Sequence, residues 1–356
     1  MPTIRQDIVF QNVDYLDVRE GDLKSGRSIY VKSGIISEIA RGKIERVGAL
    51  VCDLKGRTLM PGLIDCHVHL MGEMLEASPS AHLSAQVLRA SRRLFRMLQR
   101  GFTTVRDAGG AHAGFRTAVA QRLIPGPRLF VSGRALSQTG GHADQRSPFN
   151  FADPCGRVGL IAGFGRVADG VPDLLKAARD ELRLGADQIK IVCAGGVGSA
   201  VGTLNQSQFS DEEIRAVVEE AGRSETYVMA HVYSADGIKR LAGLGVRTIE
   251  HGNLLDEDGA RLMAKNGTFL VPNLVAYQSI AKYGRAQGYP LSGLAKLDQI
   301  LNARTRSIEL AMHSGVKIAY GSDLVKDPES QSQEFRKRGT SDVLTGDRDR
   351  QTALRS

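Results

Sequence analysis

Six residues whose side chains could take part in metal chemistry stand at or near the ends of apolar segments of this sequence. His67 and His69 are separated by one residue, so in a strand both imidazoles project from the same face and can bind one ion. An HxH pair alone is weak evidence, because two histidines also form ordinary polar clusters. Further candidate groups at other segment ends favour a metal site; these are His231, His251, Asp323 and, less usually, Lys190.

Lys190 differs from the other candidates, because an ammonium group has no lone pair and repels a cation. It lies in the apolar segment QIKIVCAG. Burial lowers the pKa of a lysine, and the neutral amine can add carbon dioxide to form a carbamate with two anionic oxygens. Such a carbamate can bridge two divalent ions. The alternative is a lysine paired with a buried carboxylate.

Strand-like segments alternate with segments of helical apolar spacing from Pro61 onward, a pattern typical of βα units on a parallel sheet. Eight strands in such alternation predict a (β/α)8 TIM barrel, whose active site lies at the C-terminal ends of the strands. The predicted strands are 63–70, 103–108, 129–134, 188–194, 227–232, 248–251, 268–272 and 317–321. The predicted helices are 84–99, 114–122, 172–184, 211–223, 234–244, 256–265 and 291–314.

Three parts of the chain are predicted from this change of pattern. Residues 1–60 contain short β-type runs and predict a partial β-sandwich module, and residues 61–338 are predicted to form the (β/α)8 barrel. Residues 339–356 are an Arg- and Asp-rich tail. The long polar segment 137–171 is expected to cover the active site, because long insertions in compact domains are usually lids or binding loops.

Composition argues against several classes of protein. The start of the sequence has no basic flank followed by an apolar run, so we expect a cytoplasmic protein that binds no membrane. The net charge of +8 is dispersed along the chain, and the absence of Trp adds to the case against nucleic-acid binding. The four cysteines form no CxxC pair, which argues against disulfides and zinc knuckles.

The segment GRTLMPGLIDCHVH at residues 56–69 carries a resemblance to a known family. From about Ile8 to Phe335 the chain resembles the amidohydrolase superfamily, in particular the imidazolonepropionase-like branch with metal-dependent Xaa-Pro dipeptidases (prolidases). The resemblance implies one ion held by His67, His69 and Asp323. It implies a second ion held by His231 and His251, with carboxylated Lys190 and a hydroxide bridging the two. Mononuclear members generally lack the lysine, so its presence favours the binuclear, amide-hydrolysing group.

Further roles follow from the same resemblance. His142, in TGGHAD, would face the scissile carbonyl and stabilise the oxyanion, and Tyr233, in HVYS, would contact the free carboxylate of the substrate. Asp323 would accept the proton of the hydroxide and pass it to the leaving amine. The glycine-rich segment 195–202 is not a dinucleotide motif, because Val201 breaks the GxGxxG spacing. We interpret it as a place where the backbone approaches the metal centre.

The predicted function is a binuclear metal-dependent amidohydrolase that cleaves a small Xaa-Pro-type dipeptide or an N-acyl amino acid with a metal-bridging hydroxide. Zinc is expected, although Mn, Co and Fe suit the same ligands. The alternatives are an Xaa-Arg/Lys-type carboxypeptidase, a cyclic or aryl amide hydrolase, and an inactive truncated fragment. The expected partners are a small peptide or amide substrate and further copies of the chain in a homo-oligomer.

The end of the sequence departs from the family. After QEFR at residues 333–336 the family normally continues through the last barrel helix and the strands that complete the β module, whereas this sequence ends at Ser356. We therefore expect a C-terminally truncated chain, with residues 339–356 disordered or non-native to the family.

Overall fold

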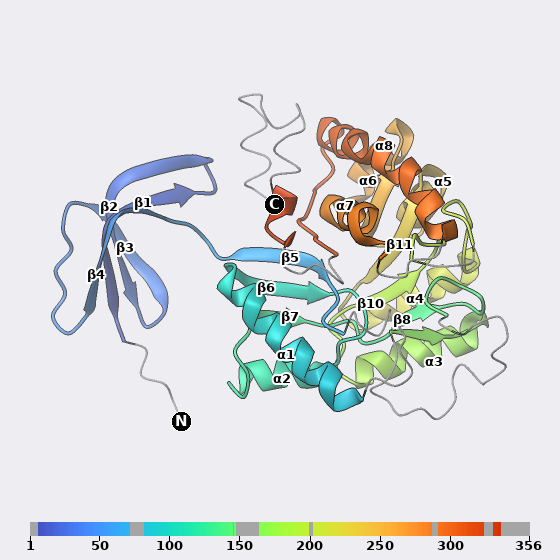
Figure 1. Cartoon of the computed structure of the whole chain (residues 1–356), viewed down its shortest axis with the longest axis horizontal. Helices are drawn as coiled ribbons and strands as arrows, with labels where there is room; N and C mark the ends of the chain where they lie inside the picture. Colours follow the sequence, from blue (N-terminus) through green and yellow to red (C-terminus); the bar gives the residue numbers. More distant parts are fainter. Residues whose placement is uncertain are drawn as a thin grey trace. The chain divides into compact units, whose positions relative to one another are not determined.

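The computed structural model describes residues 6–71, 82–144, 146, 164–198, 202–286, 291–323 and 330–335. These residues belong to two compact units, one ending at Gly62 and the other beginning at Leu63 (Figure 1). The tail predicted over residues 339–356 lies outside the described residues.

The first unit is built on a four-stranded sheet in the order β3-β2-β1-β4. Its strands are β1 (Ile8–Asp17), β2 (Asp22–Lys32), β3 (Ile35–Arg41) and β4 (Leu50–Leu59). β2 is antiparallel to both of its neighbours, whereas β4 runs parallel to β1. Val9, Tyr30 and Ile44 form the small core of the unit. The described residues of this unit form one sheet, so the predicted β-sandwich stays a prediction.

The second unit has a mixed α/β fold with two parallel sheets, which confirms the predicted fold class at this level. The three-stranded sheet has the order β5-β6-β7, and the six-stranded sheet has the order β13-β12-β11-β10-β8-β9. The strands are β5 (Leu63–Val68), β6 (Phe102–Asp107), β7 (Arg128–Phe130), β8 (Ala135–Ser137), β9 (Gly165–Val167), β10 (Ile189–Val192), β11 (Val228–Ser234), β12 (Thr248–Leu254) and β13 (Phe269–Val271).

The eighth strand predicted over 317–321 is wrong, because this segment forms one isolated bridge, between Leu270 and Ile318, and no regular strand. The pairing is confined to Leu270, the central residue of the three-residue strand β13 (Phe269–Val271). The segment still hydrogen-bonds to both sides: the Ala319 amide donates to the Leu270 carbonyl at 2.9 Å and the Cys66 amide to the Tyr320 carbonyl at 2.7 Å. It therefore links β13 to β5, while full closure into a barrel stays a prediction.

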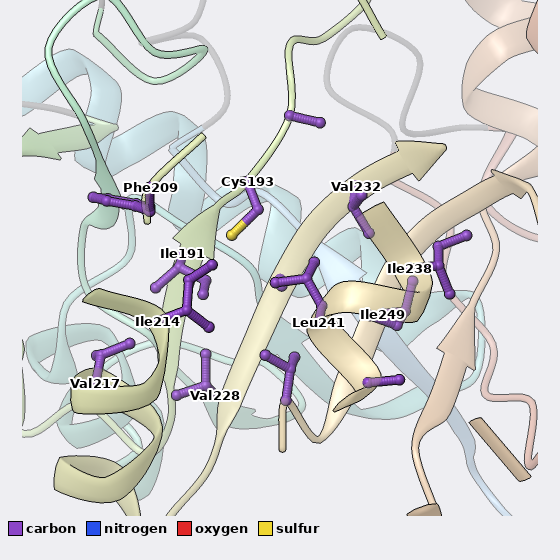
Figure 2. Packing of buried hydrophobic residues seen from close by; sticks show 14 of the residues in the cluster. Ile191, Cys193, Phe209, Ile214, Val217, Val228, Val232, Ile238, Leu241 and Ile249 are labelled. Carbon is purple, nitrogen blue, oxygen red and sulfur yellow. The ribbon is translucent and has the colours of Figure 1, made fainter. Parts of the chain in front are cut away.

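Helices cover the parallel sheets close to the predicted positions. They are α1 (Leu83–Gln99), α2 (Ala113–Ala120), α3 (Gly170–Arg183), α4 (Asp211–Arg223), α5 (Ala235–Gly243), α6 (Glu257–Asn266), α7 (Leu274–Tyr283) and α8 (Leu291–His313). The largest core cluster lies between β10 to β12 and helices α4 and α5, where Ile191, Ile214 and Leu241 pack (Figure 2). None of the described helices has the length and apolar character needed to cross a membrane.

Three elements were not predicted. β7 ends at Phe130 rather than at residue 134, and the short strand β8 follows it. β9 lies within the segment expected to be an irregular loop. α7 was missed because its first four residues, Leu274–Tyr277, are all buried, so its sequence lacks a polar face with helical period.

Residues 330–335 pack against earlier parts of the second unit, to which they belong. The side-chain amide of Gln331 donates to Asp65 Oδ2 at 2.8 Å. The Glu334 carboxylate accepts the amides of Leu274 and Val275 at 3.2 and 2.7 Å. These amides lie at the N-terminus of α7, where donors have no partner within the helix, so Glu334 caps the helix from a distant part of the chain.

Cysteine chemistry plays no part in holding the described structure together. Cys52, Cys66 and Cys193 form no disulfide among the described residues, while Cys155 lies outside them. Burial raises the pKa of Cys193 to about 12, so this residue behaves as a small buried hydrophobic group.

Candidate active site

Parallel strands bring five of the predicted metal ligands into one region. His67 belongs to β5, which His69 follows, and Lys190, His231 and His251 belong to β10, β11 and β12. Each of these side chains lies in a residue that is at most 5% exposed. A buried polar group costs free energy unless it has a hydrogen-bond or ionic partner, so the stability of this arrangement depends on the partners of each of these groups.

Asp323 joins the two histidines of the HxH pair. Its Oδ1 lies 3.2 Å from His69 Nε2 and 3.5 Å from His67 Nε2. The ligand atoms of the three residues lie within 4.8 Å of one another. The Asp323 amide also donates to the His67 carbonyl at 2.8 Å, which places the aspartate beside β5. Two imidazoles and a carboxylate are a donor set that suits zinc and similar divalent ions.

His251 and His231 lie beside this cluster, with ring centroids 4.4 Å apart. His251 Nδ1 is 3.8 Å from Asp323 Oδ2. The backbone of His251 has φ +73°, a left-handed conformation that is rare for a residue other than glycine. Asp323 has φ +49°. Left-handed backbone at two neighbouring candidate ligands is the kind of strain that concentrates at functional sites.

Three imidazoles have their Nδ1 atoms engaged by neighbouring groups. The partners are Glu250 Oε2 for His67 at 2.6 Å, the Gly109 carbonyl for His69 at 3.0 Å and the Tyr277 hydroxyl for His251 at 2.8 Å. Engagement of Nδ1 leaves Nε2 as the ligand atom, and such outer contacts are usual for histidines that bind metals. The residues present therefore fit a divalent metal centre.

Lys190 is close enough to the candidate ligands for its charge to add to the effect of burial, which lowers the pKa values of His67, His231 and His251. Burial lowers the pKa of Lys190 to about 8, against the opposing effect of Glu250 and Asp323. The lowered pKa raises the fraction of neutral amine near neutral pH, and the neutral amine is the form that can become a carbamate. Burial, helped by the charge of Lys190 and opposed by Asp323, lowers the pKa of His251 to about 3. A neutral imidazole is the form that binds a metal ion.

Glu250 is a buried residue of the site that the sequence did not reveal. It accepts hydrogen bonds from Arg106 Nη2 at 2.8 Å and from Thr248 Oγ1 at 2.6 Å, in addition to its contact with His67. In a regular strand Glu250 and His251 would point to opposite faces. The left-handed backbone of His251 interrupts this alternation, and both side chains reach the site. In the register between β11 and β12, Glu250 lies opposite His231, and this pairing with a candidate ligand is a signal that could have identified Glu250.

His142 comes from the long segment after β8 and stacks on His231, with ring centroids 4.7 Å apart. Its Nδ1 is buried and has no hydrogen-bond partner among the described residues. Burial, with smaller contributions from Lys190 and Lys296, lowers the pKa of His142 to about 4. A Cβ at Gly196 would lie 2.2 Å from the Cε1 atom of His142. The glycine-rich segment thus lets the backbone pass directly against this ring.

Two tyrosines border the site on the side of β11 and α7. The Tyr233 ring stacks on His251 with centroids 5.1 Å apart and an angle of 20°. The Tyr277 hydroxyl lies 3.3 Å from the Tyr233 hydroxyl. Tyr277 was not predicted as a residue of the site, because α7 itself was not predicted.

The sequence profile of the Amidohydrolase family matches residues 58–338. The chain belongs to the amidohydrolase family. The match begins just before the HxH pair of β5 and contains every residue of the candidate site.

Several individual proteins are similar to this amidohydrolase. A solved prolidase structure complexed with N-methylphosphonate-L-proline is 40% identical, with a TM-score of 0.93 over 99% of this chain and 85% of that one. A Xaa-Pro dipeptidase structure with bound methionine is 27% identical, with a TM-score of 0.81 over 98% and 87% of the two chains. The ochratoxinase of Aspergillus niger is 34% identical over 282 residues, which are 74% of this chain and 58% of the relative. The chain thus spans less than two thirds of that curated relative.

Proposed function

We propose that this amidohydrolase is a metal-dependent enzyme that cleaves the amide bond of a small Xaa-Pro-type dipeptide or of an N-acyl amino acid. The observation that carries the proposal is the set of imidazoles whose Nδ1 atoms are engaged, together with Asp323 close to His67 and His69 and a buried Lys190. The similarity to a prolidase and to a Xaa-Pro dipeptidase supports the class of substrate.

The same residues would hold two divalent ions, with zinc expected. His67, His69 and Asp323 would hold one ion, His231 and His251 the other, and Lys190 as a carbamate would contact both. When bound, the ions would act as Lewis acids on the amide carbonyl and lower the pKa of a water molecule toward neutrality.

Asp323 is suited to move a proton during the reaction. Burial raises the pKa of Asp323, but the neighbouring His67 and His69 outweigh this effect and hold it below its usual value. The carboxylate is therefore ionised at neutral pH and can accept a proton from the attacking water. It would then donate that proton to the leaving amine, which needs it because an amide anion is a very poor leaving group.

His142 and Tyr233 would contact the substrate. His142 is neutral at pH 7, so one ring nitrogen carries a proton that can be donated to the developing oxyanion, an interaction worth about 3 kcal/mol in comparable sites. The Tyr233 hydroxyl, beside that of Tyr277, would bind the free carboxylate of the substrate.

Hydrolysis of an ochratoxin is a second candidate, which the similarity to ochratoxinase favours. A panel assay separates the possibilities. The metal-loaded protein would be incubated with Xaa-Pro, Xaa-Arg and Xaa-Lys dipeptides, N-acyl amino acids and ochratoxin A, and the released amines would be quantified. We expect the highest kcat/KM for an Xaa-Pro dipeptide or an N-acyl amino acid. Failure to bind stoichiometric metal or to cleave any of these amides would refute the proposal.

We further propose that the chain associates with copies of itself. In the first unit Ile36, Ile39 and Leu50 are 59%, 44% and 46% exposed, which is unusual for residues of this type in a small sheet. Light scattering tests the proposal, and charged substitutions such as Ile36→Lys and Ile39→Lys should lower the measured mass.

A further inference from the structure

Two cations among the described residues of the candidate site, Arg106 and Lys190, interact with its own acidic groups. Arg106 donates to Glu250, to the Cys66 carbonyl and to Thr248, so it is committed to the buried network beneath His67. Lys190 is itself a candidate metal ligand, and the nearby Glu250 and Asp323 raise its pKa against the effect of burial. Lys190 would carry no positive charge for a carboxylate in its proposed carbamate form, and Arg106 already donates to Glu250.

Lys296, in the second turn of α8, brings a positive charge close to His142. Its ammonium group donates to the Gly196 carbonyl at 3.3 Å. Gly196 is the residue whose Cα lies directly against the His142 ring. The charge of Lys296 is close enough to contribute to the lowered pKa of His142, after burial and Lys190.

The residue after Lys296 in α8 belongs to the same apolar cluster as Tyr233. Leu297 is 3% exposed and belongs to an apolar cluster with Val197 and Tyr233. α8 is thereby packed against both the glycine-rich segment and the tyrosine proposed to bind the substrate carboxylate. A carboxylate removed from water needs a cationic partner as well as hydrogen bonds from neutral hydroxyl groups.

We propose that Lys296 is a substrate-binding residue that selects amides carrying a carboxylate on the leaving amino acid. The inference rests on the proposed function and deepens it, because it distinguishes dipeptides and N-acyl amino acids from amides that lack this negative charge. An ammonium group donates up to three hydrogen bonds, so Lys296 can hold the Gly196 carbonyl and the carboxylate at the same time. Tyr233 would contribute a neutral hydrogen bond to the same group.

A matched pair of substrates tests this directly. The pair is an Xaa-Pro dipeptide and the same dipeptide with a C-terminal carboxamide, assayed with the metal-loaded wild type, Lys296→Met and Lys296→Arg. Lys265, an exposed lysine of α6, supplies the control Lys265→Met. We expect the wild type and the control to prefer the free acid.

In Lys296→Met we expect kcat/KM for the free acid to fall about 10- to 100-fold, mainly through KM, as for the loss of a charged hydrogen bond. The rate with the carboxamide should stay within about twofold of wild type, since that substrate has no charge to lose. Lys296→Arg should restore part of the preference. Equal losses for both substrates, or an unchanged preference in Lys296→Met, would overturn the inference.

Binding of proline, a product with the same carboxylate, gives a readout that does not depend on turnover. Calorimetry on the metal-loaded proteins should show proline binding about tenfold more weakly to Lys296→Met than to wild type. If the wild type cleaves neither substrate but this difference in proline binding is present, the proposed activity fails and the role of Lys296 stands. Equal affinity of both proteins for proline would refute the role of Lys296 whatever the activity. Metal content and melting temperature confirm that the variant is folded, and Lys296→Gln replaces Lys296→Met if it is not.

Discussion

His67 Nδ1 lies 2.6 Å from Glu250 Oε2, and both residues are at most 1% exposed. Because Glu250 also accepts a hydrogen bond from Arg106 at 2.8 Å, its position is fixed independently of His67. The carboxylate therefore sets the tautomer of His67: the proton stays on Nδ1, and the Nε2 lone pair faces the candidate metal position.

Replacing Glu250 with Gln should lower metal affinity about 10- to 100-fold, the usual cost of losing such an outer contact. Competition with a chelator measures this loss without any assay of activity. Glu257→Gln is the control, because Glu257 lies at the exposed start of α6 with a side chain that is 67% exposed. Equal metal affinity in the wild type and Glu250→Gln would show that the contact is merely structural.

Changing His67 or His69 to Ala should remove both bound metal and hydrolysis, because loss of one imidazole leaves an open, weaker site. Metal per chain would be measured by atomic emission after dialysis, with about two ions expected in the wild type and fewer in each variant. A His67, His69 double variant that still holds two ions would contradict the assignment.

Lys190→Ala should lose hydrolysis while the apolar strand around it stays folded. A small carboxylate such as formate or propionate can fill the space left by the side chain and restore part of the activity. The measurement is the hydrolysis rate as a function of carboxylate concentration, with chloride at equal ionic strength as the control. Full activity of Lys190→Ala without rescue would mean that Lys190 is an ordinary buried lysine.

Gly196→Ala should reduce kcat by displacing His142, since the new Cβ would lie 2.2 Å from the ring. Loss of an oxyanion donor typically costs about 100- to 1,000-fold in kcat. The same substitution should have no further effect in a His142→Ala background, because the two changes remove the same interaction. Gly222→Ala in α4, where a Cβ meets no atom within 4 Å, should leave kcat unchanged. Additive effects of Gly196→Ala and His142→Ala would count against this mechanism.

The lowered pKa of His142 also predicts a dependence of stability on pH. The folded protein resists protonation of His142 down to about pH 4, whereas the unfolded chain takes up the proton near pH 6.5. Stability should therefore be complete above pH 6.5 and fall as the pH drops toward 4. Between pH 7.5 and pH 5, His142 should account for about 2 kcal/mol of lost stability. Urea unfolding of the metal-free wild type and His142→Asn at both pH values measures this, and an equal loss in the two proteins would contradict the prediction.

Features of the site that are determined by neighbouring residues in the sequence could be predicted, whereas features that depend on the folded backbone or on burial could not. The HxH pair at the end of β5 was recognised because strand alternation is a local property that places residues two apart, such as His67 and His69, on one face. Glu250 was missed because its role depends on an unusual backbone angle at His251, which no pattern of residue types reveals. Tyr277 was missed because burial on all sides of α7 hides the helical period.

In the fold, too, elements determined by local sequence were predicted and elements determined by distant contacts were not. Most helices were predicted to within a few residues because their amphipathic patterns and caps are local, as at α4, where Ser210 and Glu213 form a capping box. The segment 317–323 could not be predicted in this way, because its form is set by hydrogen bonds to Leu270 and Cys66, far away in the sequence. Asp323 lies beside His69 even though the regular strand expected to lead into it is not present.

The docking of residues 330–335 has a consequence for the order in which the chain is made. Gln331 contacts Asp65, 266 positions earlier, and Glu334 caps α7, the helix whose Tyr277 touches His251. During synthesis the histidines of β5, β11 and β12 leave the ribosome before the residues that hold their surroundings in place. Contacts of such long sequence separation form late in folding. A growing chain would thus carry its imidazoles for some time without an ordered centre, and we expect tight metal binding to begin only once residues 330–335 have been added.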